Sequence, residues 1–209
     1  MPSSSTVRKN DRISWDDYQT WSDDERWEII DGVAYSMSPS PTMRHQAISR
    51  ELLKQLDKYF RKKQCGVYAA PADVKLSDYD IVQPDLLVVC DQRQLKRTHV
   101  EGPPSLVVEI TSSVDNRDRV LKLHLYAAAG VKEYWIVTPF PSSVEVFLLD
   151  NGGYRLVEVY GQDGILASPS FPGLNVRLKH VFNFPLDDEE RNALRLRETA
   201  ARYRTKTQK

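Results

Sequence analysis

The chain of 209 residues is poor in cysteine and contains no long apolar run. Its two cysteines, Cys65 and Cys90, form no CxxC or Cys/His ligand spacing. Neither a zinc site nor a disulfide framework is therefore indicated, and we expect two reduced thiols in the core. The first ten residues lack the apolar segment of a signal peptide, and no run approaches the roughly 18 apolar residues of a membrane span. We therefore expect a soluble, cytoplasmic protein without a membrane partner.

The chain also lacks an excess of either charge, with 29 basic and 29 acidic residues. With 41% apolar and 28% charged residues, its composition is that of a globular protein with one large domain or a domain with appendages. Binding to DNA would need a local basic surface, because counterion release requires clustered cations. Two clusters qualify, although ordinary solvated surface is the simpler interpretation of each: Arg61, Lys62 and Lys63, and Arg93, Lys96 and Arg97.

Hydrophobic periodicity predicts two main helices. In residues 44–63 the apolar side chains of Ile48, Leu52 and Leu56 recur every four positions and so share one face. The second helix, 115–129, ends at Gly130. A short helix at 14–21 and a charged helix at 187–209 are also predicted, although the latter could equally be a solvated tail.

Seven strands and one hairpin complete the prediction. Residues 26–37 have the pattern of a β-hairpin, because apolar runs flank Asp31-Gly32, a dipeptide that tolerates the positive φ angles of a type I′ turn. The strands are predicted at 67–70, 73–76, 85–89, 106–111, 131–137, 144–149 and 154–160. Those at 85–89 and 106–111 are almost entirely apolar, as expected for strands covered on both faces.

Two of these apolar strands carry a carboxylate, Asp85 and Glu109. A charged group in a buried strand costs several kcal/mol unless it is paired or binds a metal, so two such groups suggest a site. Proline 84 is tolerated at the first strand position, where its missing N–H is not needed. Strand alternation places Glu109 on the same face as Thr111. A hard cation such as Mg²⁺ takes one or two carboxylates together with waters and phosphate oxygens, which these residues could supply.

A cation follows these acids on the second helix. Lys122 lies between Asp118 and Tyr126 at intervals of four residues, so the three form one polar row. Two interpretations stay open at this point. Lys122 could belong to the carboxylate site, or it could form an ordinary surface ion pair with Asp118, which lies four residues before it in the favourable orientation.

Several segments together resemble the Uma2 family of restriction-type endonucleases. The segments are VQPDLLVV at 82–89, GPPSLVVEI at 102–110, RDRVLK at 117–122, YAAAGVKEYWIV at 126–137 and WEIIDG at 27–32. The resemblance covers about residues 14–182. It implies the PD-(D/E)xK nuclease superfamily and its α/β (mixed α+β) restriction-endonuclease-like core, in which helices flank a central mixed β-sheet, here with an N-terminal β-hairpin. The implied organisation is a flexible leader at 1–13, a nuclease-like domain at 14–182 and a charged C-terminal helix or tail at 183–209.

The resemblance also implies roles for individual residues. Asp85 and Glu109 would bind Mg²⁺ or Mn²⁺, and Lys122 would replace the superfamily lysine, which normally stands two residues after the second acid, where this chain has Thr111. Glu28 and His45 also fall on family motif positions and receive auxiliary roles. Their structural alternatives are a strand-end ion pair for Glu28 and a helix-start cap for His45.

The implied function is metal-dependent hydrolysis of DNA phosphodiester bonds. The metal would activate a bound water and offset the charge of the transition state, while Lys122 would orient that water or offset the extra negative charge. A homodimer is expected, because cutting both strands with one site per chain requires two copies. The alternative is a catalytically inactive nuclease-fold protein that binds nucleic acid or acts as a scaffold, motivated by Thr111 and the zero net charge. A metal-independent acyl hydrolase is disfavoured, because the chain contains no G-x-S-x-G elbow.

Overall fold

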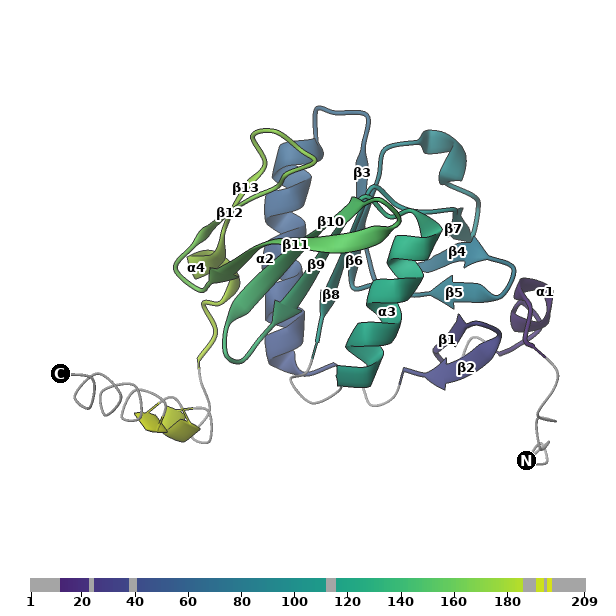
Figure 1. Cartoon of the computed structure of the whole chain (residues 1–209), viewed down its shortest axis with the longest axis horizontal. Helices are drawn as coiled ribbons and strands as arrows, with labels where there is room; N and C mark the ends of the chain where they lie inside the picture. Colours follow the sequence, from purple (N-terminus) through teal and green to yellow (C-terminus); the bar gives the residue numbers. More distant parts are fainter. Residues whose placement is uncertain are drawn as a thin grey trace.

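The computed structural model describes residues 12–22, 25–37, 41–111, 116–185, 191–193 and 195–196, with the side chains of 116–118 excepted. Most of the predicted leader at 1–13 and most of the predicted C-terminal helix or tail at 183–209 lie outside these residues. Figure 1 shows a body in which two helices, α2 and α3, lie against a central sheet, while a smaller sheet stands to one side. No helix among the described residues is both long and apolar enough to span a bilayer.

Six strands form the larger sheet. They are β3 (Gly66–Ala69), β6 (Leu86–Val89), β8 (Leu106–Ile110), β9 (Glu133–Thr138), β10 (Ser143–Asp150) and β11 (Gly153–Gly161). Their order is β11-β10-β9-β8-β6-β3, and every pair of neighbours is antiparallel except β8 and β9. A parallel pair needs a crossover connection, and the chain between β8 and β9 supplies it with a helix. The predicted mixed sheet is confirmed, and six of the seven predicted strands lie in it.

The two predicted helices cover opposite faces of this sheet (Figure 1). Helix α2 (Met43–Phe60) buries Ile48, Leu52 and Leu56 against the side chains of β6 and β8 that point towards this helix, such as Val108. Helix α3 (Asn116–Ala129) packs Tyr126 on the other set, which includes Val107. Because neighbouring strand residues point to opposite faces, an almost continuous apolar run is what a sheet covered on both sides requires.

The smaller sheet contains the predicted N-terminal hairpin. Its strands are β1 (Trp27–Ile30), β2 (Val33–Ser36), β4 (Asp73–Ser77), β5 (Asp80–Val82) and β7 (His99–Glu101), in the order β2-β1-β5-β4-β7. The turn residues Asp31 and Gly32 have φ angles of 51° and 73°, which confirms the predicted type I′ turn. Strands β5 and β7 were not predicted, because three residues are too few to show a period.

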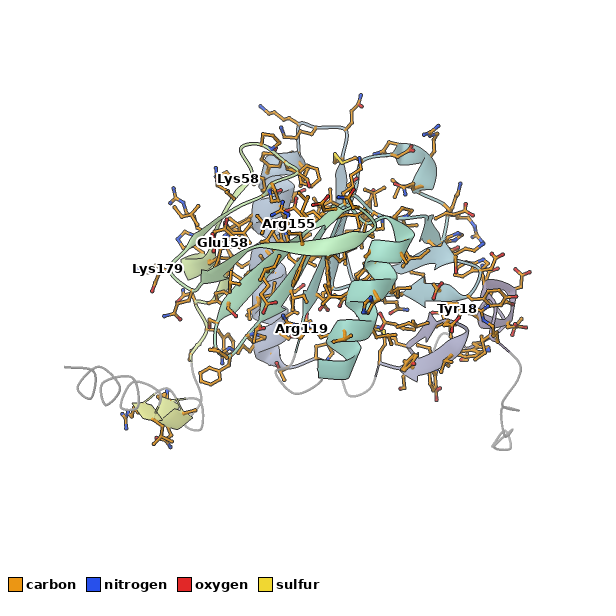
Figure 2. The ribbon with its side chains drawn as sticks, viewed as in Figure 1. Tyr18, Lys58, Arg119, Arg155, Glu158 and Lys179 are labelled. Atoms are coloured by element: carbon orange, nitrogen blue, oxygen red, sulfur yellow. A yellow bond between two sulfur atoms is a disulfide. The ribbon has the colours of Figure 1, made fainter. Side chains whose placement is uncertain are left out.

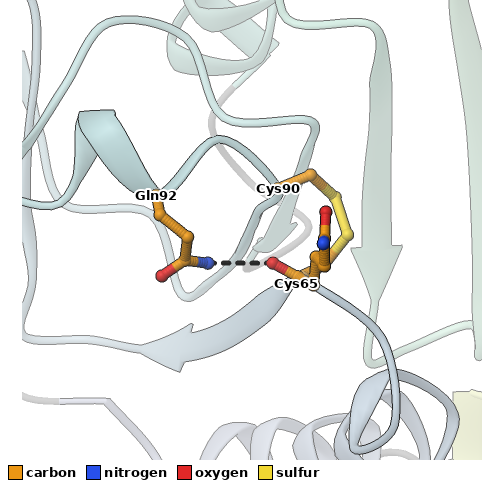
Figure 3. Close-up of a disulfide and its surroundings, with 4 residues drawn as sticks. Cys65, Cys90 and Gln92 are labelled. Carbon is orange, nitrogen blue, oxygen red and sulfur yellow. Dashed lines mark hydrogen bonds between the residues drawn. A yellow bond between two sulfur atoms is a disulfide. The ribbon is translucent and has the colours of Figure 1, made fainter.

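The prediction of two free thiols is wrong. Cys65 and Cys90 form a disulfide with a Cα–Cα distance of 4.0 Å (Figure 3). Cys65 directly precedes β3 and Cys90 directly follows β6, and the antiparallel pairing of Gly66 with Val89 sets the two cysteines opposite each other. The linear spacing of 25 residues carries no sign of this register, so motif spacing could not reveal the pair.

The remaining elements are short and mostly unpredicted. They are α1 (Trp15–Tyr18), which confirms the helix predicted after Ser14, the 3₁₀ turn η1 (Gln92–Gln94), β12 (Ile165–Ala167), β13 (Asn175–Arg177) and α4 (Leu178–Val181). The β12–β13 segment is fastened to the main sheet by Glu133, a fully buried residue of β9. Its carboxylate accepts hydrogen bonds from Ser168 Oγ at 2.8 Å and from the backbone N–H of Ser170 at 2.9 Å.

Candidate active site

Five residues singled out in the sequence come from five different segments of the fold. Glu28 lies on β1, His45 on the first turn of α2, Asp85 directly before β6, Glu109 near the end of β8 and Lys122 on α3. Lys122 contacts both Glu28 and Glu109, while His45 contacts Asp85, whose carboxylate also accepts from the backbone N–H of Ile110, next to Glu109. Glu109, Lys122 and Glu28 are each about 95% buried, with relative exposures of 6%, 6% and 5%.

Asp85 is held beside Glu109 by the pairing of β6 with β8. Leu86 pairs with Val108 in this antiparallel ladder. Asp85, which directly precedes β6, therefore lies opposite Glu109 of β8. Asp85 Oδ2 accepts a hydrogen bond of 2.7 Å from the backbone N–H of Ile110. This bond fixes the Asp85 carboxylate next to the residue that follows Glu109.

His45 contacts the same carboxylate. Its Nε2 lies 3.1 Å from Asp85 Oδ2, while its Nδ1 is buried and has no hydrogen-bond partner among the described residues. The helix cap is a different residue, Thr42, whose Oγ1 accepts from the backbone N–H of His45. The imidazole of His45 therefore contacts the Asp85 carboxylate and does not cap the helix.

Lys122 reaches the acids from α3. Its Nζ lies 3.0 Å from Glu109 Oε1 and 3.0 Å from Glu28 Oε2. The side chain of Asp118, the partner in the alternative interpretation, lies outside the described side chains. A buried ammonium between two buried carboxylates differs from a surface ion pair, since desolvation leaves it dependent on those partners.

Neighbouring groups fix the orientation of both glutamates. Tyr126 lies one helical turn after Lys122, and its hydroxyl donates to Glu109 Oε1 at 2.7 Å. The backbone N–H of Gln83 donates to Glu28 Oε1 at 3.0 Å. Tyr126 could be anticipated from the polar row on the helix, whereas no sequence signal pointed to the contribution of Gln83.

Burial changes the acidity of the site. It raises the pKa of Glu109 to about 8, and the nearby negative charges of Glu28 and Asp85 act in the same direction, while Lys122 and the Tyr126 hydroxyl oppose the rise. Burial, followed by the charges of the two glutamates, also raises the pKa of the Tyr126 hydroxyl well above its ordinary value of 10.0. Three carboxylates share this region with a single lysine, so an added cation would be electrostatically favourable.

Asp85 and Glu109 are the carboxylates that could bind a divalent cation. No group of three or more His, Cys, Asp or Glu residues in the described part has the arrangement of a complete metal site. Within that part, the hydrogen bonds and ion pairs of Asp85 use Oδ2 and those of Glu109 use Oε1. Each carboxylate thus keeps a second oxygen, and two carboxylates completed by waters and substrate oxygens suit Mg²⁺.

Comparisons with known proteins agree with this architecture. A crystal structure of a putative nuclease of DUF820 from Anabaena variabilis superposes with a TM-score of 0.66, covering 81% of this chain and 97% of that one at 20% sequence identity. The protein therefore has the fold of that nuclease class. Residues 15–179 match the family model of Uma2, described as "Putative restriction endonuclease", and the chain belongs to this family. A protein of Synechocystis sp. described as uncharacterized is 28% identical over 160 residues, which are 73% of this chain and 83% of that protein.

Proposed function

We propose that this protein is a metal-dependent endonuclease that hydrolyses phosphodiester bonds of DNA. The observation that carries the proposal is the contact of Lys122 Nζ with Glu109 Oε1 at 3.0 Å, beside a second carboxylate, Asp85, that the backbone of Ile110 holds in place. Two acids and one amine, drawn from two neighbouring strands and the following helix, are the groups that the PD-(D/E)xK chemistry requires. The family description of a restriction endonuclease supports DNA as the substrate.

Asp85 and Glu109 would bind the metal, Mg²⁺ or Mn²⁺, through Asp85 Oδ1 and Glu109 Oε2, the carboxylate oxygens that make no hydrogen bond or ion pair within the described residues. When bound, the cation would lower the pKa of a coordinated water and offset the negative charge that develops on the phosphorus centre. The raised pKa of Glu109 fits this role, because a carboxylate destabilised by burial and by neighbouring acids gains most from a cation.

Lys122 would supply the positive charge that Thr111 does not carry. An ammonium group donates up to three hydrogen bonds, so Lys122 can keep its contact with an acid while it orients a water or a phosphate oxygen. Glu28 would act as a positioning residue, since its Oε2 lies 3.0 Å from Nζ and its Oε1 is fixed by Gln83. Tyr126 would fix Glu109 in the same way.

His45 would position Asp85. Its Nε2 approaches the carboxylate oxygen that also accepts from Ile110, so the two donors together determine the direction of the remaining oxygen. The positioning role differs from direct catalysis, because it predicts a weaker apparent affinity for the metal when His45 is changed, with partial recovery at higher metal concentration.

The test is nicking of supercoiled plasmid with and without Mg²⁺ or Mn²⁺. Asp85→Asn, Glu109→Gln and Lys122→Met should each lower the single-turnover rate at least about 100-fold, the scale expected when a group that stabilises transition-state charge is lost. The matched control is Glu133→Gln, which alters another buried glutamate of the same sheet, 0% exposed, outside the candidate site. Equal losses in Glu109→Gln and in Glu133→Gln, each with the melting temperature of the wild type, would refute the assignment.

A catalytically inactive nucleic-acid-binding protein is the alternative, favoured by Thr111 at the usual lysine position. The same assay separates the two functions. DNA binding without metal-dependent cleavage by any variant, wild type included, would support the binding protein. The expected homodimer remains a prediction, which the mass of the protein in solution, alone and with duplex DNA, would check.

A further inference from the structure

A groove of about 560 Å³ lies on the α2 side of the sheet, between that helix and the segment formed by β13 and α4. Its lining includes Lys54, Lys58, Tyr59, Asn175, Arg177 and His180. The two walls are joined by reciprocal bonds, because Gln55 Oε1 accepts from the backbone N–H of Arg177 at 2.9 Å and Gln55 Nε2 donates to the Arg177 carbonyl at 3.3 Å. The groove is therefore built into the fold.

Cations gather along this groove from segments more than 100 residues apart in the chain. Arg50, Lys54 and Lys58 are exposed and stand at intervals of four residues, so they form one row along α2. Arg177 is exposed on the opposite wall, and Lys179 is exposed two residues further along the chain, whereas Arg50 and Lys179 themselves lie outside the groove lining. Figure 2 shows Lys58 and Lys179 on the same side of the molecule, away from Tyr18. We refer to these five residues, Arg50, Lys54, Lys58, Arg177 and Lys179, as the basic track.

Four side chains of the basic track, all except Lys54, have no ion pair or hydrogen bond within the described part of the chain. Lys54 Nζ lies 3.4 Å from Glu51, but its side chain is 75% exposed. The clusters suggested by the sequence differ. Arg61 pairs with Asp57 and Lys96 pairs with Glu101, at 2.7 Å and 3.2 Å respectively.

Arg93 of the second cluster is likewise paired, at 2.7 Å from Asp91. Nearby acids thus neutralise some of the cations in both clusters that the sequence suggested. The basic track faces solvent, and Glu51 is the one acid among the described residues that line the groove. In a chain with no net charge, this distribution leaves a positive surface at the groove.

We propose that the basic track binds the phosphodiester backbone of DNA outside the candidate active site; this inference rests on the proposed function. Helix α2 connects the two regions, because His45 on its first turn contacts Asp85. Lys54 and Lys58 follow His45 by nine and thirteen residues. At 1.5 Å per residue these positions lie about 14 Å and about 20 Å along the helix.

That distance corresponds to about four to six base pairs at 3.4 Å per step. At 3.6 residues per turn, Lys54 and Lys58 project from α2 about 180° and about 140° away from His45, so the basic track would contact DNA that extends beyond the candidate active site and around α2. Because flexible cations recognise phosphate groups and not base edges, the basic track would increase the affinity for DNA and orient it on the protein without reading its sequence. The recognised chemistry is thus the repeated phosphate charge of the backbone.

The experiment measures binding of a fluorescent 30-base-pair duplex by anisotropy, in EDTA so that no cleavage occurs, between about 50 and 200 mM salt. The test variant is Lys58→Ala/Arg177→Ala. The control, Arg93→Ala/Arg97→Ala, removes the same charge from another exposed site. We expect the test variant to bind at least about tenfold more weakly at the lowest salt, with the slope of log K against log[salt] reduced by about 1.8, while the control stays within about twofold of wild type.

Equal weakening in both variants would overturn the proposal, because it would indicate a response to net charge alone. Wild-type binding by the test variant, or no binding by the wild type at the lowest salt, would overturn it as well. Thermal unfolding midpoints matching wild type establish that the exposed substitutions leave the fold intact. The proposed nuclease function fails separately, if the wild type binds the duplex but does not cleave plasmid with Mg²⁺ or Mn²⁺.

Discussion

Replacing Lys122 by methionine tests the charge arrangement of the candidate site without substrate. The substitution keeps the length of the side chain and removes the ammonium that lies 3.0 Å from both Glu109 and Glu28. At an effective dielectric constant of 20, each contact at 3 Å corresponds to about 5 kcal/mol of attraction, most of which offsets the cost of burying the charges. Breaking a buried pair by removing one partner costs about 3–5 kcal/mol, which we take as the expected loss of stability near pH 9.

The loss should depend on pH in a defined direction. Below a pH of about 8 Glu109 is largely protonated, so fewer negative charges lose their partner. Lys122 also lowers the pKa of Glu109, so its removal should shift that pKa further upward. We therefore expect Lys122→Met to cost less free energy of unfolding at pH 6 than at pH 9.

Urea denaturation at both pH values measures these costs, and a double-mutant cycle with Glu109→Gln isolates the interaction. The double variant should lose at least about 1 kcal/mol less than the sum of the two single losses, because the residues are in direct contact. Additive losses, or a cost below about 1 kcal/mol at pH 9, would show that Lys122 is not a buried counter-charge. Added Mg²⁺ should stabilise the wild type more than Asp85→Asn, since only the former keeps both proposed ligands.

Three further predictions concern stability. Relative to Glu109→Gln, the wild type should become less stable as the pH rises from about 4.5 to about 8, because the unfolded state releases the proton of Glu109 at a lower pH than the folded state. Chemical denaturation across this range should show the stability difference falling by at most about 1.4 kcal/mol per pH unit. A stability difference that rises with pH would contradict the raised pKa of Glu109. Reducing the Cys65–Cys90 bond, which spans 25 residues, should lower the free energy of unfolding by about 3 kcal/mol, whereas a Cys65→Ser/Cys90→Ser variant should not respond to reductant. Gly32→Ala should destabilise the protein by at least about 1 kcal/mol, because φ is +73° there and an added Cβ would lie 2.6 Å from Arg12 Cβ; an unchanged melting temperature would refute this.

Local chemistry made the main elements of the fold predictable. The Asp31-Gly32 turn and the four-residue spacing on α2 each depend on residues close together in the chain, so the sequence displays them directly. Short elements were missed for the same reason. Strand β7 exists because it pairs with β4, and β13 because it pairs with β12, and neither three-residue run carries a periodic pattern of its own.

The candidate site was predictable where a residue violates its surroundings. Glu109 is an acid in an otherwise apolar buried strand, which makes it a candidate for a functional role even in a single sequence. Lys122 was ambiguous, because a local acid, Asp118, explained it equally well. Two of its partners, Glu109 and Glu28, lie 13 and 94 residues away, and the pairing of strands and the crossover helix brings them together. The disulfide was unpredictable for the same reason.

The position of the lysine also explains why the N-terminal hairpin belongs to the site. A lysine at position 111 would stand directly after β8, two residues after Glu109, where the hydrogen bond from the backbone N–H of residue 111 to the Val137 carbonyl fixes its direction. A lysine on α3 approaches from outside the sheet and needs a second anchor to keep its Nζ at Glu109. Glu28 provides that anchor. It lies on β1, whose pairing with β2 is fixed by the tight turn at Asp31 and Gly32. We therefore expect Glu28→Gln to impair DNA cleavage by this protein, and a Thr111→Lys substitution in the Glu28→Gln background to restore part of the activity. A rate left unchanged by Glu28→Gln would show that Lys122 needs no second anchor.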